Sequence, residues 1–406
     1  MEVVHERCAG LDVHSRRISA CARVVTERGV SREVCSFGTS TRELREMAAW
    51  LESRGCTHVA MESTGVYWKP VWHVLEGRFE LVLANAQQVR NMPGRKSDVN
   101  DATWIAELLA HGLIRPSFVP PAAVQHFRDL TRTRKQLVRE IARHTLRIQR
   151  TLEDANIKLT EVISNVLGTS GRAILAALAA GETDPDKLVE LTSGRLKASR
   201  DQIREALRGT MTDHHAFMIK LHLKQIEQLE HAVREVEART SAGPFRAAIE
   251  LLSTIPGISE TTAAVIVAEI GDDMSRFPTA GHLLSWAGLC PRMDESAGKR
   301  LSNRTRRGAP WLKTALVQAA WPASTKRDSY FRSRFLRLKN RRGPKKAVVA
   351  VAASILTAAY YMLKTGAEYH DLGATHLDHV DRQRTTNHLV RRLNALGYKV
   401  SLEPAA

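Results

Sequence analysis

The first 86 residues alternate short apolar runs with longer stretches of helical periodicity. Apolar, β-branched runs that are short enough to be strands occupy residues 18–25, 34–37, 58–61 and 79–83. A helix is expected over residues 41–54, with Thr41 as its N-cap and Glu43 in its first turn. Strands that first follow one another and then alternate with helices predict a mixed sheet with helices packed on it.

Beyond residue 121 the apolar spacing changes to heptads, after prolines at 116, 120 and 121 have interrupted the chain. The apolar a and d positions are Phe127, Leu130, Leu137, Ile141 and Ile148 in a first run, and Ile219, Ile226, Leu229, Val233 and Val236 in a second. Arg134 and His144 interrupt the first seam. Two such helices with an all-helical insert between them, over residues 159–207, predict an antiparallel coiled-coil arm.

A Pro-Gly turn between two short helices is expected at Pro256 and Gly257, with Ser259 as the N-cap of the second helix. This pattern is typical of a helix-hairpin-helix, whose backbone N–H groups can hold a DNA phosphate without reading its sequence. A plain helical turn is the alternative. Further on, residues 347–363 are almost wholly apolar, but the stretch is short and rich in alanine, which favours a buried helix over a membrane helix.

The expected fold therefore combines an α/β part with an all-α part in four segments. These are a mixed-sheet domain over residues 1–120, a helical coiled-coil region over 121–241, a mainly helical domain over 242–365 and a tail over 366–406.

The composition identifies the class of partner. Among 406 residues the formal net charge is +17, so the chain is expected to meet a polyanion, nucleic acid before a membrane surface. Cations on the outer faces of the first heptad helix favour nucleic-acid contact or dimerisation over a purely structural bundle; they are Arg128, Arg132, Lys135, Arg139, Arg143, Arg147 and Arg150. Five cysteines without a C-x-x-C pair indicate neither a zinc site nor a disulfide framework, and the start has no signal-peptide pattern, so a cytoplasmic protein is expected.

Four acidic residues stand at the ends or starts of the predicted elements. Asp12 follows one apolar run and Glu62 another, while Asp98 and Asp101 lie three apart at the start of a predicted helix that opens at Lys96. Two carboxylates on one helix face repel each other unless a cation lies between them. Mg²⁺ prefers such oxygen ligands, and the arrangement suits a ribonuclease-H-like or resolvase-like nuclease core. Each acid alone is more simply a helix cap or a solvated charge, but four acids that all stand at strand ends or helix starts favour the metal site.

A serine candidate lies in the C-terminal third. Ser296 stands beside Ala297 and Gly298 and is followed by Lys299 and Arg300, so it is exposed and close to phosphate-binding groups, although most serines are turn or surface residues. The following chain is densely basic and contains aromatic residues, which favours a nucleic-acid groove over a solvated face. Residues of the tail with metal-ligand chemistry (His370, Asp371, His376, Asp378, His379 and Asp381) are more simply interpreted as surface residues.

Six ordered motifs together carry a resemblance. They are Gly10–His14, Met61–Gly65, Lys96–Ala102, Ile255–Ile258, Ala287–Pro291 and Glu295–Lys299. With them the chain resembles the DEDD transposases of bacterial insertion sequences of the IS110 family, relatives of the pilin-gene DNA invertases.

The resemblance implies more than the residues alone do. It implies that Asp12, Glu62, Asp98 and Asp101 bind Mg²⁺ or Mn²⁺ in a RuvC-like domain and that Ser296 is the nucleophile. It also implies recombination of donor and target DNA, usually through a circular intermediate, guided by a structured non-coding RNA that bridges both DNAs. The active species is expected to be a homo-oligomer, a dimer that assembles into a tetramer.

Nucleic-acid contacts are expected at twelve positions: Arg132, Lys135, Arg139, Arg143, Gly257, Lys299, Arg300, Arg304, Arg306, Arg307, Arg341 and Arg342. Two other functions fit the residues. One is a metal-dependent endonuclease or junction resolvase in which Ser296 takes no part, and the other is a basic nucleic-acid-binding protein without catalysis.

Overall fold

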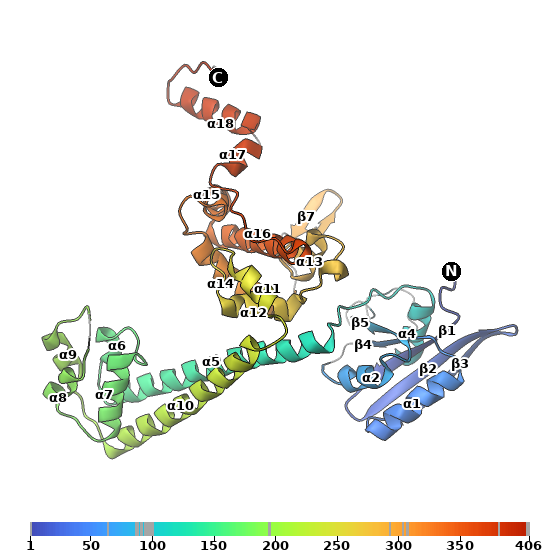
Figure 1. Cartoon of the computed structure of the whole chain (residues 1–406), viewed down its shortest axis with the longest axis horizontal. Helices are drawn as coiled ribbons and strands as arrows, with labels where there is room; N and C mark the ends of the chain where they lie inside the picture. Colours follow the sequence, from blue (N-terminus) through green and yellow to red (C-terminus); the bar gives the residue numbers. More distant parts are fainter. Residues whose placement is uncertain are drawn as a thin grey trace. The chain divides into compact units, whose positions relative to one another are not determined.

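The computed structural model describes residues 2–62, 65–85, 89, 92, 101–193, 196–291, 294–302, 304–305, 308–380 and 382–402. For residues 294, 296, 300, 301, 384 and 385 this description covers the backbone alone. The chain divides into two compact units, residues 1–119 and residues 120–406 (Figure 1).

A five-stranded mixed sheet forms the centre of the first unit, in the order β3-β2-β1-β4-β5. Its strands are β1 (Arg7–Val13), β2 (Arg17–Thr26), β3 (Gly29–Gly38), β4 (His58–Glu62) and β5 (Glu80–Ala84). The first three strands are antiparallel neighbours, and β4 and β5 continue the sheet in parallel to β1. The sequence prediction of a mixed sheet is therefore correct, although β3 begins five residues before the predicted run.

Helices cover both faces of this sheet. One face packs its apolar side chains against α1 (Thr41–Ser53) and α2 (Trp68–Leu75). The other face lies against α4 (Asp101–Ala110), as Figure 1 shows. The predicted N-cap of α1 is wrong by one residue, because Ser40, not Thr41, accepts the hydrogen bond from the backbone of Glu43 in a reciprocal capping box.

The second unit contains two long helices, α5 (Ala122–Asp154) at its start and α10 (Asp213–Ser241) further along the chain. They pack side by side in antiparallel order: Arg134 contacts Glu237 near one end of the pair, and Asp154 contacts His215 near the other. Four short helices lie between them: α6 (Leu159–Val162), α7 (Thr169–Ala179), α8 (Pro185–Glu190) and α9 (Arg200–Ala206). The predicted pair of helices with an all-helical insert is present.

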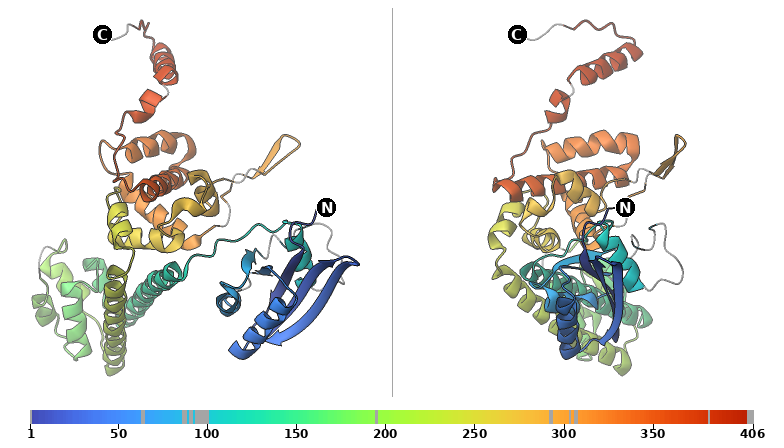
Figure 2. Two further views of the ribbon diagram at one scale, coloured as in Figure 1. Left: turned by 45° about the vertical axis from the view of Figure 1, so that its right-hand side comes forward. Right: turned by 90° about the vertical axis from the view of Figure 1, so that its right-hand side faces the viewer.

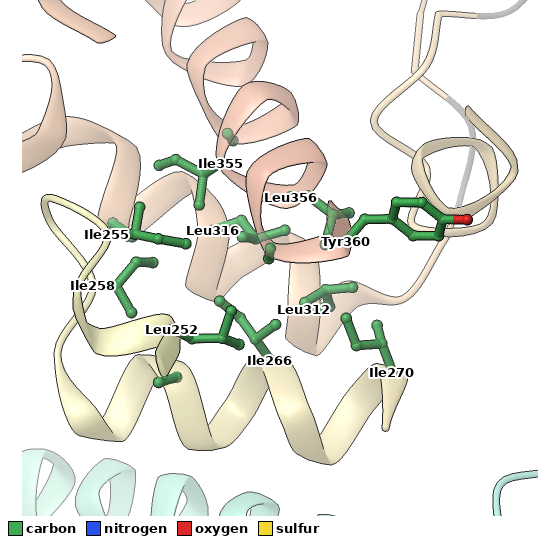
Figure 3. Close-up of a cluster of buried hydrophobic side chains, with 14 of the residues drawn as sticks. Leu252, Ile255, Ile258, Ile266, Ile270, Leu312, Leu316, Ile355, Leu356 and Tyr360 are labelled. Carbon is green, nitrogen blue, oxygen red and sulfur yellow. The ribbon is translucent and has the colours of Figure 1, made fainter. Parts of the chain in front are cut away.

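The rest of the unit is a helical domain with one small ribbon. Its helices are α11 (Arg246–Ser253), α12 (Glu260–Ile270), η1 (Met274–Arg276), α13 (Ala280–Trp286), α14 (Pro310–Ala323), α15 (Tyr330–Arg342) and α16 (Pro344–Thr365). Side chains from α11, α12, α14 and α16 share one core, in which Ile266, Leu316 and Ile355 are fully buried (Figure 3).

Helix α16 is the predicted apolar helix. Among the described residues it alone is long and apolar enough to span a membrane, but half of its apolar window is buried in this core. The Tyr360 hydroxyl donates a 2.9 Å hydrogen bond to the backbone oxygen of Phe277, which fixes the helix against the chain before α13. The helix is therefore a core helix, as predicted.

The tail continues into α17 (His376–Val380) and α18 (Arg382–Ala395). Two of its acids have structural partners: Asp371 accepts hydrogen bonds from the backbone of Tyr330 and Gly373, and Asp378 pairs with Arg337. Asp381 lies outside the described residues.

Candidate active site

Asp12 and Glu62 lie beside each other at the carboxyl ends of two parallel strands. The register of β1 and β4 pairs Leu11 with Met61, so the next residue along each strand is one of the two acids. Leu11 and Met61 point into the core under α1 and α2. Because side chains alternate along a strand, the two acids face the opposite side of the sheet, where α4 lies.

Helix α4 lies in direct contact with this face. A Cβ atom on Gly10 would be 2.2 Å from the backbone oxygen of Ala102 and 2.3 Å from the backbone nitrogen of Ala106, so only glycine permits the observed approach. Gly10 is two residues before Asp12 on β1, and Ala102 follows Asp101, the first described residue of α4. The first turn of α4, which begins at Asp101, therefore lies over the face that holds Asp12 and Glu62.

An ion pair between a buried arginine and a half-buried glutamate holds α4 on the sheet. Arg23 on β2 is 2% exposed and donates through Nε to Oε2 of Glu107 on α4, at 3.1 Å. Arg32 on β3 donates to the same oxygen at 2.9 Å. Burial raises the pKa of the Glu107 carboxyl, but hydrogen bonds from the two arginines outweigh this and hold that pKa below its usual value. Sequence reasoning missed Arg23, although an arginine between buried positions of a strand was a visible signal.

The fourth acid, Asp98, lies outside the described residues. Among the described residues, no group of three or more His, Cys, Asp or Glu side chains lies close enough to hold a metal ion. The side chain of Asp12 lies beside His14, whose Nε2 is 3.1 Å from Oδ2. Carboxylate oxygens are the ligands that hard divalent cations take, so the donor chemistry of these residues fits Mg²⁺ or Mn²⁺.

Ser296 is the last residue of a strand at the tip of a hairpin. The ribbon consists of β6 (Asp294–Ser296) and β7 (Lys299–Ser302), joined by Ala297 and Gly298. Both turn residues have positive φ angles, 50° and 74°, as a two-residue turn of type I′ requires. The register sets the backbone of Ser296 opposite Lys299, so the serine and a cation are neighbours across the ribbon. In both views of Figure 2 the ribbon projects from the helices of its unit.

The base of this ribbon is fastened to the helical domain. Pro291 and Thr305 form an isolated antiparallel bridge. Lys313 on α14 donates from Nζ to Thr305 Oγ1 at 2.7 Å and to the backbone oxygen of Gly288 at 3.1 Å. The hairpin therefore has a fixed root, although it projects at its tip.

Three of the expected nucleic-acid contacts lie together at that root. Arg304, Arg341 and Arg342 line one cavity of about 710 Å³. Lys299 is exposed on the ribbon, and Arg300 lies on β7, where the structure describes its backbone. Arg306 and Arg307 lie outside the described residues.

The expected contacts on α5 lie in a different environment. Arg132 donates to both carboxylate oxygens of the buried Glu269 on α12. Its guanidinium also lies 5.4 Å from the ring centre of Trp311 on α14, beside Lys135 at 5.3 Å and Arg139 at 5.4 Å. These contacts give Arg132 a part in joining α5 to the helical domain that the heptad pattern does not predict.

The two remaining contacts also have neighbours within the chain. Arg143 is exposed and pairs with Glu140 on the same helix. Gly257 has φ +85°, and a Cβ on it would lie 2.5 Å from the backbone oxygen of Ala319, so this glycine lets the turn before α12 approach α14. Ser259 is the N-cap of α12, as predicted.

Comparison with known proteins gives matches at both ends of the chain. Residues 9–157 match the family of DEDD-type IS110 transposases, and residues 249–336 match the transposase family IS116/IS110/IS902. The first match contains all four candidate acids and the second contains Ser296.

Individual curated proteins are also similar to this chain. The chain is 23% identical to the pilin gene-inverting protein of Moraxella lacunata over 366 residues, which cover 87% of this chain and 95% of the relative. It is 31% identical over 150 residues, 35% of each chain, to an uncharacterized 43.6 kDa protein of insertion element IS110 from Streptomyces coelicolor.

Proposed function

The chain belongs to the IS110 family of transposases and is a DNA recombinase, and from this premise we propose that it exchanges DNA strands through a covalent bond between Ser296 and DNA. The first unit supplies the carboxylates and the second supplies the serine. Two relatives that match over 366 residues are named as pilin gene-inverting proteins, and inversion of a gene requires that cut strands be rejoined.

One observation carries the proposal. Ser296 stands beside a two-residue turn at the tip of a ribbon, with Lys299 opposite it and five further cations at the ribbon's root. A nucleophile at a projecting tip can approach a DNA backbone, and the cations around it favour phosphate.

The carboxylates support the same chemistry. Asp12 and Glu62 face one side of the sheet, the first turn of α4 with Asp101 lies over that side, and Asp98 precedes Asp101 by three residues in the sequence. A divalent cation bound there supplies electrostatic stabilisation of the charge that develops on phosphate. The role of the chain is to hold these carboxylates at the strand ends, through the close packing of α4 and the Arg23–Glu107 pair.

The strand transfer conserves the phosphodiester bond energy. The Ser296 oxygen bonds to phosphorus as its proton leaves, the bond from phosphorus to the 3′ oxygen breaks, and that oxygen takes up a proton to become a 3′ hydroxyl. The 3′ hydroxyl of another strand then attacks the phosphoserine and releases the serine. Lys299 stabilises the phosphate on either side of the exchange.

Selection of the DNA sites is proposed to rest on a structured non-coding RNA that pairs with donor and target. A protein that delegates recognition to base pairing needs cationic surfaces that follow the backbone more than side chains that read bases. A dimer that assembles into a tetramer would bring the acidic site of one subunit to the serine of another.

The experiment is strand exchange on the element's circular junction DNA, with its flanking transcribed RNA, in Mg²⁺ or in EDTA. Joined products that require the RNA and the cation, and that are lost in Asp12→Asn but not in the surface variant Glu2→Gln, support the proposal. Cut products without any joined ones, unchanged in Ser296→Ala, would favour the alternative function, a metal-dependent endonuclease or junction resolvase.

A further inference from the structure

A cavity at the root of the serine ribbon has two contrasting surfaces. Its floor is aliphatic and consists of Leu289, Leu338, Val349 and Ala350. Its rim carries five cations, namely Arg304, Arg341, Arg342, Lys345 and Lys346. No acidic residue is among the described residues that line it, and none of the five cations forms an ion pair within the part of the chain that the structure describes.

These cations come from three separate segments. Arg341 and Arg342 end α15, Lys345 and Lys346 lie in the first turn of α16, and Arg304 follows β7. Cations that repel each other are gathered here around Gly343, whose φ of +82° permits the sharp turn between the two helices. These exposed cations have no acidic partner among the described residues, so they form a positive surface that favours an anion.

The volume and the floor indicate what that anion is. A bare phosphate would need the rim but not an aliphatic floor of four residues in a cavity of about 710 Å³. A nucleotide satisfies both surfaces, because its phosphate is anionic and the face of its base is apolar. A base that remains paired inside a duplex cannot reach the floor, so the base has to leave the stack.

We propose that this cavity binds one unpaired nucleotide of the DNA strand that Ser296 attacks. Pro291, which lines the cavity, is five residues from Ser296, so the two lie at most about 18 Å apart along an extended chain. At a spacing of about 3.4 Å per nucleotide along a strand, the bound nucleotide lies within about five nucleotides of the attacked phosphate. This inference rests on the proposed function for the identity of the strand, but not on the chemistry at Ser296.

The test measures binding by Ser296→Ala protein, which lacks the proposed nucleophile. Three probes share one sequence of 24 base pairs: an intact DNA duplex, the same duplex with a single unpaired nucleotide, and the RNA counterpart of the second probe. We expect the DNA probe with the unpaired nucleotide to bind about fivefold more tightly than the intact duplex, as a contact of about 1 kcal/mol gives.

Two variants test the contributions of the aliphatic floor and of the cationic rim separately. Val349→Glu places a charge on the aliphatic floor and is expected to abolish the fivefold preference. The double variant Arg342→Gln and Lys345→Gln is expected to weaken all DNA probes and to lower the slope of log affinity against log salt concentration by about 2. The matched control, Lys326→Gln with Arg327→Gln, removes two exposed cations that do not line the cavity and is expected to leave the preference unchanged.

Several outcomes would overturn the inference. Equal binding of the paired and unpaired DNA probes would do so, as would a preference that survives Val349→Glu in a protein whose thermal unfolding matches the parent. Tighter binding of the RNA probe than of its DNA counterpart would assign the cavity to RNA instead. Because Ser296 is absent from every arm, failure here leaves the proposed strand transfer untouched, and failure of the strand transfer leaves this preference measurable.

Discussion

Arg132 on α5 donates to both carboxylate oxygens of Glu269 on α12, at 2.9 and 3.0 Å. The Glu269 side chain is 3% exposed, and Arg128 adds hydrogen bonds to the backbone oxygens of Ala268 and Glu269. A buried carboxylate depends on its partners because burial disfavours its charged form. The pair therefore joins the first long helix to the helical domain that carries Ser296.

Loss of this pair is expected to destabilise the packing of α5 against α12. Arg132→Met leaves Glu269 buried with Arg128 as its remaining cationic partner, which we expect to cost about 3 kcal/mol, at the lower end for a broken buried pair. The matched change Arg134→Met breaks the more exposed pair with Glu237 and is expected to cost at most about 1 kcal/mol. Urea unfolding followed by circular dichroism measures both, and equal costs would contradict the assigned role.

Gly10→Ala tests the packing of α4 on the sheet. The added methyl would lie 2.2 Å from a backbone oxygen, so α4 must move, and we expect a cost of about 3 kcal/mol or more. Since α4 carries Asp101, strand exchange is expected to fall further than the loss of folded protein explains. Gly281→Ala is the control, because its Cβ meets its nearest neighbour at 3.5 Å and alanine favours the helix. Unchanged activity and unfolding in Gly10→Ala would show that α4 does not lie where the structure places it.

The packing of α10 against α5 is expected to loosen in mild acid. Burial, with the neighbouring His144 and Arg147, lowers the pKa of His222, whose Nδ1 lies 3.2 Å from Nδ1 of His144. The folded chain therefore takes up a proton there less readily than the unfolded chain. Stability from this site is complete above pH 6.5 and is lost as the pH falls below that value.

Hydrogen exchange of peptides from residues 213–241 measures this effect between pH 7.5 and 5, above the range in which the carboxylates with lowered pKa titrate. After correction for the intrinsic rate, protection is expected to fall in the parent and to stay level in His222→Gln. A parallel fall in both proteins would assign the loss to other groups.

Much of the fold follows from local pattern. The strand alternation locates β4 and its terminal Glu62, and the apolar run of residues 347–363 predicts a core helix because it has no polar face. The serine N-cap at Ser259 is equally local. The N-cap of α1 could also be predicted from sequence, because Ser40 and Glu43 have the spacing of a capping box. Thr41 was predicted instead, since threonine is also a common N-cap residue.

The site is less predictable because it depends on contacts between distant segments. The heptad pattern places the cations of α5 on its outer faces, where they were expected to meet nucleic acid, whereas Arg132 and Lys135 lie against α12 and α14, more than a hundred residues away. The hairpin at Ser296 has Ala-Gly in its turn, and alanine at a positive φ is not a residue that the turn type favours. The gathering of Arg304 with Lys345 is likewise produced by tertiary structure alone.

The most direct measurement of the central claim is a search for a covalent protein–DNA adduct, mapped to a residue by mass spectrometry. The protein is incubated with junction DNA, the flanking RNA and Mg²⁺, denatured and digested, and the peptide that carries the nucleotide is sequenced. Ser302→Ala on the same ribbon is the control for Ser296→Ala. The account predicts an adduct on Ser296 that persists in Ser302→Ala and disappears in Ser296→Ala and Asp12→Asn. Cleavage and joining that proceed without any adduct in the parent, or an adduct that survives Ser296→Ala, would contradict it.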